Sequence, residues 1–245
     1  MRGCGQTDKG IVRRDNQDYF HIDQLEDGKL ILCVVCDGMG GARAGNVASR
    51  MAAETFVEEL SEKKAGFTNK ALIHEAMREA VEKANRVVYE GSKGHGDYKG
   101  MGTTLVGGVL RGNKAHIINV GDSRAYHVSK GKIHRITRDH SLVEDMIFRG
   151  DITPEEARSH PNKNLITRAV GIDNKVNWDI YTLDLKAGDR LLFCSDGLVD
   201  IVSDEEILEE IKRYHSDLEK CCEMLIHLAL ARGGPDNVTV LLVKV

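Results

Sequence analysis

The stretch from 103 to 136 constrains the fold most, because its apolar runs follow one another with only short turns between them. Strand-like runs at 103–110 and 115–121 are separated by a turn at 111–113, and a second turn is marked by the Lys-Gly pair at 130–131. Connections this short can join only antiparallel neighbours, since parallel strands need a crossover of a dozen or more residues. The stretch therefore predicts an antiparallel meander and disfavours a βαβ repeat.

Helical patterns fall in pairs between groups of strands. Strands are also predicted at 18–23, 30–36, 190–195 and 238–245, and helices at about 42–60, at about 69–90, and from 153, 203 and 216 onward. This grouping predicts an α+β layered domain. Because no linker and no internal repeat interrupts the pattern, we expect residues 1–245 to form a single domain. The Gly-rich stretch 91–102 is predicted to be a flexible connector, and about 140–172 a helical insert or flap.

Charge and hydropathy exclude several classes of function. The chain has 38 acidic and 34 basic residues, for a formal charge of −4, and no long block of Lys or Arg, so a nucleic-acid partner is not expected. The longest apolar run, 30–36, is far too short to cross a membrane. No apolar signal core follows Met1, and we expect a cytoplasmic protein with no membrane partner.

Six cysteines in 245 residues do not suggest a disulfide scaffold. Cys33 and Cys36 form a CxxC, which is compatible with a redox or zinc pair but also with two small apolar residues of a buried strand. The second interpretation is favoured because no further Cys pair or His follows at zinc spacing. Cys221 and Cys222 lie on a helical pattern and are predicted to be core residues.

Four aspartates stand at predicted strand ends. Asp37, Asp122 and Asp196 each follow a strand, and Asp236 stands just before the last one. If the last strand runs antiparallel to the others, its start lies where they end, and the four carboxylates could meet on one rim of a sheet. An Asp-Gly after a strand is usually only a turn, so the prediction depends on all four together. Clustered carboxylates suit hard divalent cations such as Mn²⁺ or Mg²⁺.

Asp37 is followed by Gly38-Met39-Gly40-Gly41, which clears side chains from the backbone. The carbonyl of Gly38 could then serve as a further metal ligand. A tight strand-to-helix turn explains the same glycines, and the two interpretations are compatible.

Six segments in fixed order carry a resemblance to a known family. They are Arg13-Arg14-Asp15-Asn16-Gln17-Asp18, Asp37-Gly38-Met39-Gly40-Gly41, Gly102-Thr103-Thr104, Gly121-Asp122-Ser123-Arg124, Ser195-Asp196-Gly197-Leu198-Val199-Asp200 and Gly234-Pro235-Asp236-Asn237. Together they resemble the motifs of the PPM (type 2C) metal-dependent protein serine/threonine phosphatases, over essentially the whole chain. The compact length and Met39 resemble bacterial members that oppose Ser/Thr kinases.

The resemblance implies a fold and a metal site. The fold is a four-layer sandwich of two antiparallel sheets flanked by pairs of helices, with the flap as a small insert. By similarity Asp37 bridges two Mn²⁺ or Mg²⁺ ions, the Gly38 carbonyl binds one of them, and Asp196 and Asp236 complete the pair. Asp122 matches a ligand of a third, weaker ion.

The resemblance also implies a reaction. Two such ions about 3.5–4 Å apart lower the pKa of a shared water, which attacks phosphorus without a covalent phosphoenzyme. Arg13 matches the arginine that grips the phosphate, and as a sequence feature it could equally be an ordinary surface residue. Met39 stands where many eukaryotic members have a His proposed to protonate the leaving group, and Gln17 where the family usually has a Glu that orients metal-bound water.

The implied substrates are phosphoserine and phosphothreonine proteins, with a cognate Ser/Thr kinase and its substrates as partners, and the expected state is a monomer. Two alternatives stay open on the sequence. One is a non-catalytic family member that binds phosphoproteins, against which the presence of all four matched aspartates weighs. The other is a dinuclear metal phosphoesterase acting on small molecules or nucleic acid.

Overall fold

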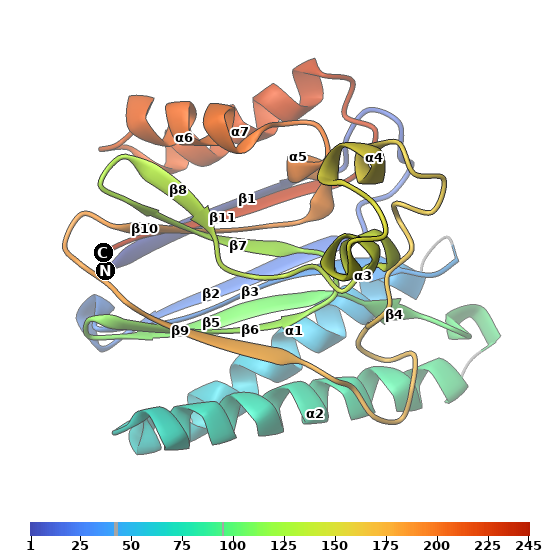
Figure 1. Cartoon of the computed structure of the whole chain (residues 1–245). Helices are drawn as coiled ribbons and strands as arrows, with labels where there is room; N and C mark the ends of the chain where they lie inside the picture. The colour runs from blue at the N-terminus through green and yellow to red at the C-terminus, as the bar shows by residue number, and fades with distance from the viewer. Residues whose placement is uncertain (42–43, 95) are drawn as a thin grey trace.

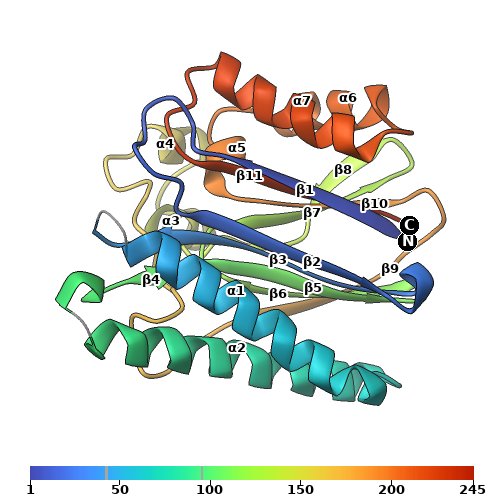
Figure 2. The same cartoon turned by 180° about the vertical axis from the view of Figure 1, so that it is seen from behind.

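The computed structural model describes residues 1–41, 44–94 and 96–245 and arranges them in four layers (Figure 1). Two antiparallel sheets are stacked face to face. Helices α1 (Ala44–Lys63) and α2 (Lys70–Gly94) cover the outer face of one sheet, and α6 (Asp204–Arg213) and α7 (Leu218–Ala231) cover the other (Figures 1 and 2). The predicted α+β sandwich with flanking pairs of helices is confirmed.

Each sheet mixes strands from distant parts of the chain. The first sheet has the order β1 (Arg2–Asp8), β11 (Val238–Lys244), β10 (Arg190–Cys194), β7 (Arg124–Ser129) and β8 (Lys132–Arg135). The second has the order β2 (Asp18–Leu25), β3 (Leu30–Met39), β5 (Leu105–Arg111), β6 (Lys114–Val120) and β9 (Asp179–Asp184), and the short β4 (Gly102–Thr103) pairs with the end of β3. The strand pairs are antiparallel, as the meander predicted.

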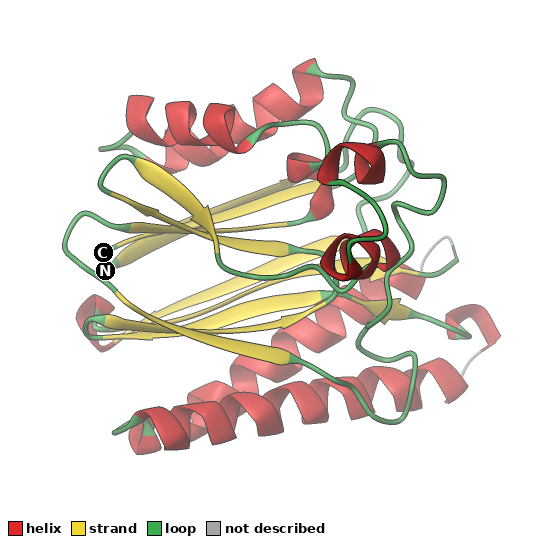
Figure 3. Cartoon of the chain, in the orientation of Figure 1, coloured by secondary structure: helices red, strands yellow, loops and turns green. Residues whose placement is uncertain are grey.

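The shorter helices gather at one end of the sandwich, among the loops (Figure 3). They are α3 (Leu142–Arg149), α4 (Pro154–Arg158) and α5 (Asp196–Val199), and short 3-10 turns occur at Glu26–Gly28, Lys64–Gly66 and Gly96–Tyr98. Capping boxes open α4 at Thr153 with Glu156 and α6 at Ser203 with Glu206, whereas α7 begins after Asp217, whose side chain accepts from Lys220 N. Helices α3 and α4 lie within the predicted flap, 140–172.

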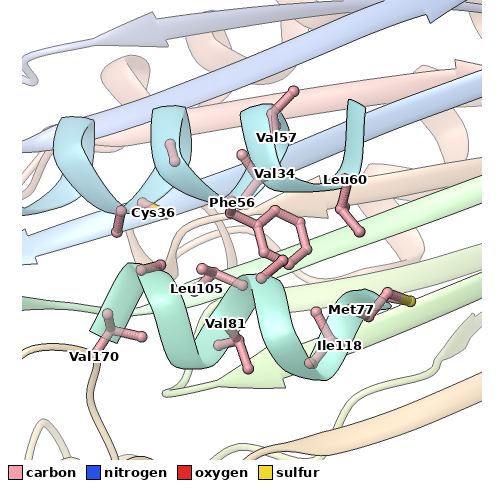
Figure 4. Close-up of a cluster of buried hydrophobic side chains, with 14 of the residues drawn as sticks. Val34, Cys36, Phe56, Val57, Leu60, Met77, Val81, Leu105, Ile118 and Val170 are labelled. Carbon is pink, nitrogen blue, oxygen red and sulfur yellow. The ribbon is translucent and has the colours of Figure 1, made fainter. Parts of the chain in front are cut away.

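Three apolar clusters hold the layers together. One fills the space between α1, α2 and the second sheet, where the fully buried Phe56, Leu60 and Met77 interlock with the strands (Figure 4). A second lies under α6 and α7, and a third between the sheets. Cys33 belongs to the cluster between the sheets and Cys36 to the one under α1 and α2, so their side chains leave β3 on opposite faces. The buried-strand interpretation of the CxxC is therefore confirmed.

Several sequence-based boundaries need correction. Strands β1 and β9 were not predicted, and the expected connector 91–102 instead begins inside α2, which runs to Gly94. The predicted meander does not stay in one sheet, because β5 and β6 lie in the second sheet and β7 and β8 in the first. The first two residues of the helix predicted from 42 lie outside the described residues. Within the described ranges no helix is long and apolar enough to cross a membrane.

Candidate active site

The sequence predicted Asp37 just after the end of a strand, but in the structure it lies inside β3. Pairing with β4 carries β3 on to Met39. The Asp37 backbone N–H donates to Thr104 Oγ1 at 2.9 Å, and its carbonyl accepts from Thr104 N and Thr103 Oγ1, both at 2.8 Å. The two threonines of the third motif thus fix the backbone that carries the Asp37 carboxylate.

Gly38 is a glycine because the chain is crowded there. A Cβ at this position would lie 2.0 Å from the carbonyl oxygen of Gly45 and 2.7 Å from that of Gln17. The Gly38 N–H donates to the Gln17 carbonyl at 3.0 Å. The absent side chain therefore lets the first turn of α1 approach β3 directly beside Asp37.

Asp18 is a site residue that received no role from the sequence. It faces Asp37 in the β2–β3 register and is only 6% exposed. Its Oδ2 accepts from Ser195 Oγ and Thr239 Oγ1, both at 2.7 Å, so it joins the second sheet to the first. Its place at the end of the first motif, opening a strand, was the available signal, but the pairing with Asp37 is a tertiary feature.

Asp196 and Asp236 come from the first sheet. Asp196 opens α5 directly after β10, and Asp236 precedes β11. The turns that carry Asp196 and Asp236 are in close contact. A Cβ at Gly197 would lie only 1.9 Å from the carbonyl oxygen of Asn237. The Asn237 side chain accepts from Gln17 N at 2.8 Å, which fastens the loop before β2 to the same end of the sandwich.

Asp122 lies where the chain crosses from β6 in the second sheet to β7 in the first. The next residue, Ser123, is hydrogen-bonded through Oγ to Thr104 Oγ1 at 2.7 Å. Gly121 has φ +105° and donates its N–H to His140 Nδ1 at 3.1 Å. The crossing is thereby held on one side by β4–β5 and on the other by the start of the flap.

The predicted aspartates come together, but at the end of the sandwich between both sheets and not on one rim of a single sheet. Burial raises the pKa of Asp37 well above its ordinary value, and the charges of Asp18, Asp196, Asp122 and Asp236 raise it further. The sheet assignment was wrong because the sequence did not reveal that the chain changes sheets at Asp122.

The pKa values of the other carboxyls report the same crowding. Burial, with the charges of Asp122, Asp200 and Asp236, raises the pKa of Asp196 well above its ordinary value. Burial also raises the pKa of Asp18 and of Asp122 to about 6. Burial is the largest cause of these shifts and the charges of neighbouring carboxylates add to it, so bound positive charge would favour the ionised cluster.

The carboxylate oxygens gathered at this site are the type of ligand that hard divalent cations bind. Asp18 Oδ1 and Asp196 Oδ1 are buried and have no hydrogen-bond partner within the described part of the chain, although buried carboxylate oxygens are normally partnered. With the side chains in these positions, no three His, Cys, Asp or Glu residues of the described ranges lie close enough together to bind one metal ion. The ligand roles of Asp37, Gly38, Asp122, Asp196 and Asp236 therefore stay predictions.

Arg13 lies at the entrance to this cluster. It is exposed, and its Nη2 donates to Asp236 Oδ2 at 2.7 Å. The predicted phosphate-binding guanidinium and a predicted metal ligand are thus in direct contact.

A cleft of about 680 Å³ opens from the carboxylates toward the flap and α6. Asp122 and Asp196 line its inner end, and Ile147 and Arg158 of the flap line its side. Lys163 of the flap pairs with Asp200 after α5 at 2.9 Å and also lines the cleft. A smaller hollow of about 160 Å³, beside Val128, contains none of the predicted site residues.

Comparison with known proteins decides the family. The family model described as "Protein phosphatase 2C" matches residues 8–229. The chain belongs to the protein phosphatase 2C family. The resemblance drawn from its six motifs is confirmed.

Individual serine/threonine phosphatases match along nearly the whole chain. A serine/threonine phosphatase, stp, of Listeria monocytogenes is 37% identical over 239 residues, covering 98% of this chain and 94% of that protein. The structure of a Streptococcus agalactiae serine/threonine phosphatase superposes with a TM-score of 0.93 at 38% identity, covering 100% of this chain and 99% of the other.

The catalytic domain of the serine/threonine protein phosphatase PstP, solved in complex with two manganese ions, superposes with a TM-score of 0.84 at 34% identity, covering 99% of this chain and 97% of that one. The PstP of Mycobacterium tuberculosis is 37% identical over 245 residues, and this chain spans 45% of its length. The match therefore concerns one part of that protein.

Proposed function

We propose that this protein phosphatase 2C member hydrolyses phosphoserine and phosphothreonine in proteins with the help of two Mn²⁺ or Mg²⁺ ions. The observation that carries the proposal is the cluster of buried, mutually repelling carboxylates, in which Asp18 Oδ1 and Asp196 Oδ1 lack partners in the described ranges. Hard divalent cations satisfy such oxygens and remove the repulsion.

The residues that would hold the ions are Asp37, the carbonyl of Gly38, Asp196 and Asp236, with Asp122 near a third ion. Divalent cations bound there supply a water of lowered pKa and positive charge against the phosphate. The carboxylates are oriented by backbone contacts around Asp37 and by hydroxyls at Asp18, so the charge pattern exists before substrate arrives.

Arg13 is proposed to bind the substrate phosphate. Its guanidinium already contacts a carboxylate oxygen at the entrance, and the oxygens of a phosphate dianion can accept the same kind of charge-assisted hydrogen bond. Cys33 and Cys36 cannot replace a metal-activated water as nucleophile, because they are fully buried and burial raises the pKa of both thiols. Met39 has no proton to give to the leaving alkoxide.

Gln17 is proposed to orient water beside the ions. Its Nε2 lies 3.5 Å from the Gly41 carbonyl, and its side chain packs against Gly45, close to Gly38. Gln17 could instead merely cap the turn before Asp18, but the side-chain hydrogen bond in that turn comes from Asn16, whose Oδ1 accepts from Asp18 N at 3.1 Å.

The polypeptide substrate is proposed to lie in the cleft between the flap, 140–172, and α6. This cleft begins at the carboxylates and is large enough for several side chains. We further propose that residues 1–245 act as one domain and as a monomer in the cytoplasm, on the products of a Ser/Thr kinase.

A substrate comparison tests the function. Activity should appear on a phosphothreonine peptide with Mn²⁺, be much weaker on single-stranded DNA, and vanish after chelation. A small phosphate ester cleaved far better than the peptide would favour the small-molecule phosphoesterase. Peptide binding without turnover at saturating Mn²⁺ would favour the non-catalytic alternative.

A further inference from the structure

Two cysteines far apart in the sequence meet on the outer face of the first sheet. Cys4 lies in β1 with a half-buried side chain, and Cys222 lies in α7 and is only 1% exposed. Their Sγ atoms are 3.2 Å apart. A disulfide has an S–S distance of about 2.05 Å, so the sulfurs need to approach by only about 1.2 Å.

Exposure and pKa distinguish Cys4 from the other thiols. The hydrogen bond from Cys222 lowers the pKa of Cys4, while burial opposes the shift. Burial instead raises the pKa of Cys33, Cys36 and Cys194, which are fully buried. An accessible thiol of lowered pKa beside a buried partner is the arrangement of a thiol that oxidises selectively.

We propose that Cys4 and Cys222 form a reversible oxidation site, in which hydrogen peroxide converts the two thiols into a disulfide joining β1 to α7. The Cys4 thiolate attacks one peroxide oxygen, the O–O bond breaks, and the released hydroxide takes a proton to give water. The Cys222 sulfur then attacks the Cys4 sulfenic acid, the S–O bond breaks, and a second water leaves with the Cys222 proton. Two thiols are oxidised, one peroxide is reduced, and a dithiol reductant reverses the change.

The site is separate from the carboxylate cluster. In the β1–β11 register Cys4 faces Leu242, four residues from the pair Asp8 and Val238 at the end nearest Asp236. At about 3.3 Å per residue this is roughly 13 Å along the strand. The crosslink would join two residues 218 positions apart in the sequence and would lie away from the carboxylates, so its expected effect is on stability and not on catalysis.

Mass spectrometry tests the proposal on the full chain treated with hydrogen peroxide. The expected product loses the mass of two hydrogen atoms, gives a crosslinked pair of peptides containing Cys4 and Cys222, and returns to the starting mass with dithiothreitol. Its Tm should exceed that of the reduced form by about 5–15 °C. Oxygen added to Cys4 without a crosslink, or a crosslink to Cys221, would overturn the proposal.

Single substitutions distinguish the roles of the two thiols in the reaction. Cys4→Ser should abolish the crosslink, whereas Cys222→Ser should leave a sulfenic acid on Cys4 that dimedone traps. Cys221→Ser is the matched control beside Cys222 on α7 and should crosslink as the wild type does. A crosslink that persists in Cys222→Ser would contradict the pairing.

The neighbouring ion pair gives a further test that does not change either sulfur. Arg2 Nη2 contacts Glu219 Oε1 at 2.7 Å, and their charges act on Cys4 in opposite directions. Arg2→Gln should therefore slow the reaction with peroxide, and Glu219→Gln should accelerate it, although both break the same ion pair. Equal rates in the two variants would contradict attack by the Cys4 thiolate.

Discussion

Asp37 is a carboxylate placed where both burial and its neighbours oppose its charge. Groups of this kind are typical of functional sites, which give up stability for activity. Asp37→Asn should therefore abolish measurable turnover of a phosphothreonine peptide. In the metal-free protein the same change should raise stability by about 0.5–2 kcal/mol, because it removes a repelled charge.

Thermal unfolding in the presence of chelator measures the second effect. The control is Asp184→Asn, at an exposed carboxylate paired with Lys114 on the second sheet. It should alter neither activity nor Tm appreciably. A metal-free Asp37→Asn protein less stable than wild type would show that Asp37 is a structural residue and not a repelled one.

Arg13 should act on the substrate and not on the fold. Because it is exposed and its contact with Asp236 is a surface ion pair, Arg13→Ala should change stability by less than about 1 kcal/mol. Losing a charge-assisted contact to phosphate costs about 1.5–3 kcal/mol, so kcat/KM should fall roughly tenfold to a hundredfold. Arg14→Ala, at the next residue, is the control, and similar kcat/KM values in the two variants would reduce Arg13 to a surface residue.

At the scale of elements, long periodic helices and strands bounded by turn residues were predictable. Helices α1, α2, α6 and α7 carry their own apolar stripes, and α6 and α7 also carry their own capping residues, so local sequence determines them. Strand β1, with the sequence RGCGQTD, has weak strand propensity and exists because it pairs with β11 at the other end of the chain. Local patterns contain no signal for such a long-range partner.

The sequence allowed the types of residue at the site to be predicted, but their arrangement in space only in part. Asp37, Asp122, Asp196 and Asp236 could be named, because aspartates beside strand ends recur in a known order of motifs. Asp18 received no role, since its importance follows from the β2–β3 register and from contacts across the two sheets. Which sheet each strand joins depends on packing between layers, and a strand's own sequence does not specify it.

The flap is joined to the rest of the site by the ion pair of Lys163 and Asp200, which lies at the cleft. Both side chains are about 40% exposed, so Lys163→Ala should cost less than about 1 kcal/mol in stability. If the flap shapes the binding of polypeptides, kcat/KM for a phosphoprotein should fall several-fold while that for p-nitrophenyl phosphate stays unchanged. Lys114→Ala, at an ion pair on the second sheet, should leave both substrates unaffected, and equal losses on both substrates in Lys163→Ala would contradict this role.

At the scale of the whole molecule, the carboxylate cluster should make the stability of the metal-free protein depend on pH. Burial raises the pKa of Asp18 from an ordinary value near 4 to about 6, so the folded state binds this proton more tightly than the unfolded state. Its contribution to stability is present below pH 4 and is lost as pH rises through 6. Buried His116, whose pKa burial lowers to about 4, acts in the opposite direction over the same range.

A comparison of variants isolates the contribution of Asp18. The stability of wild type relative to Asp18→Asn, measured by urea unfolding with chelator present, should fall between pH 4 and 6 by up to about 1.4 kcal/mol per pH unit. Saturating Mn²⁺ should abolish this difference in slope, because bound cations favour the charged carboxylates. A difference that does not change with pH in the metal-free proteins would contradict the shifted pKa.

The carboxylates gathered between the ends of the two sheets should form a centre for divalent cations. Anomalous scattering from a crystal of the protein grown with Mn²⁺ tests this prediction most directly, because it locates the metal independently of activity. At least two manganese peaks should appear, one of them within coordination distance of both Asp37 and the Gly38 carbonyl, at about 2.0–2.3 Å. Peaks only elsewhere on the molecule, or none at saturating Mn²⁺, would contradict the account.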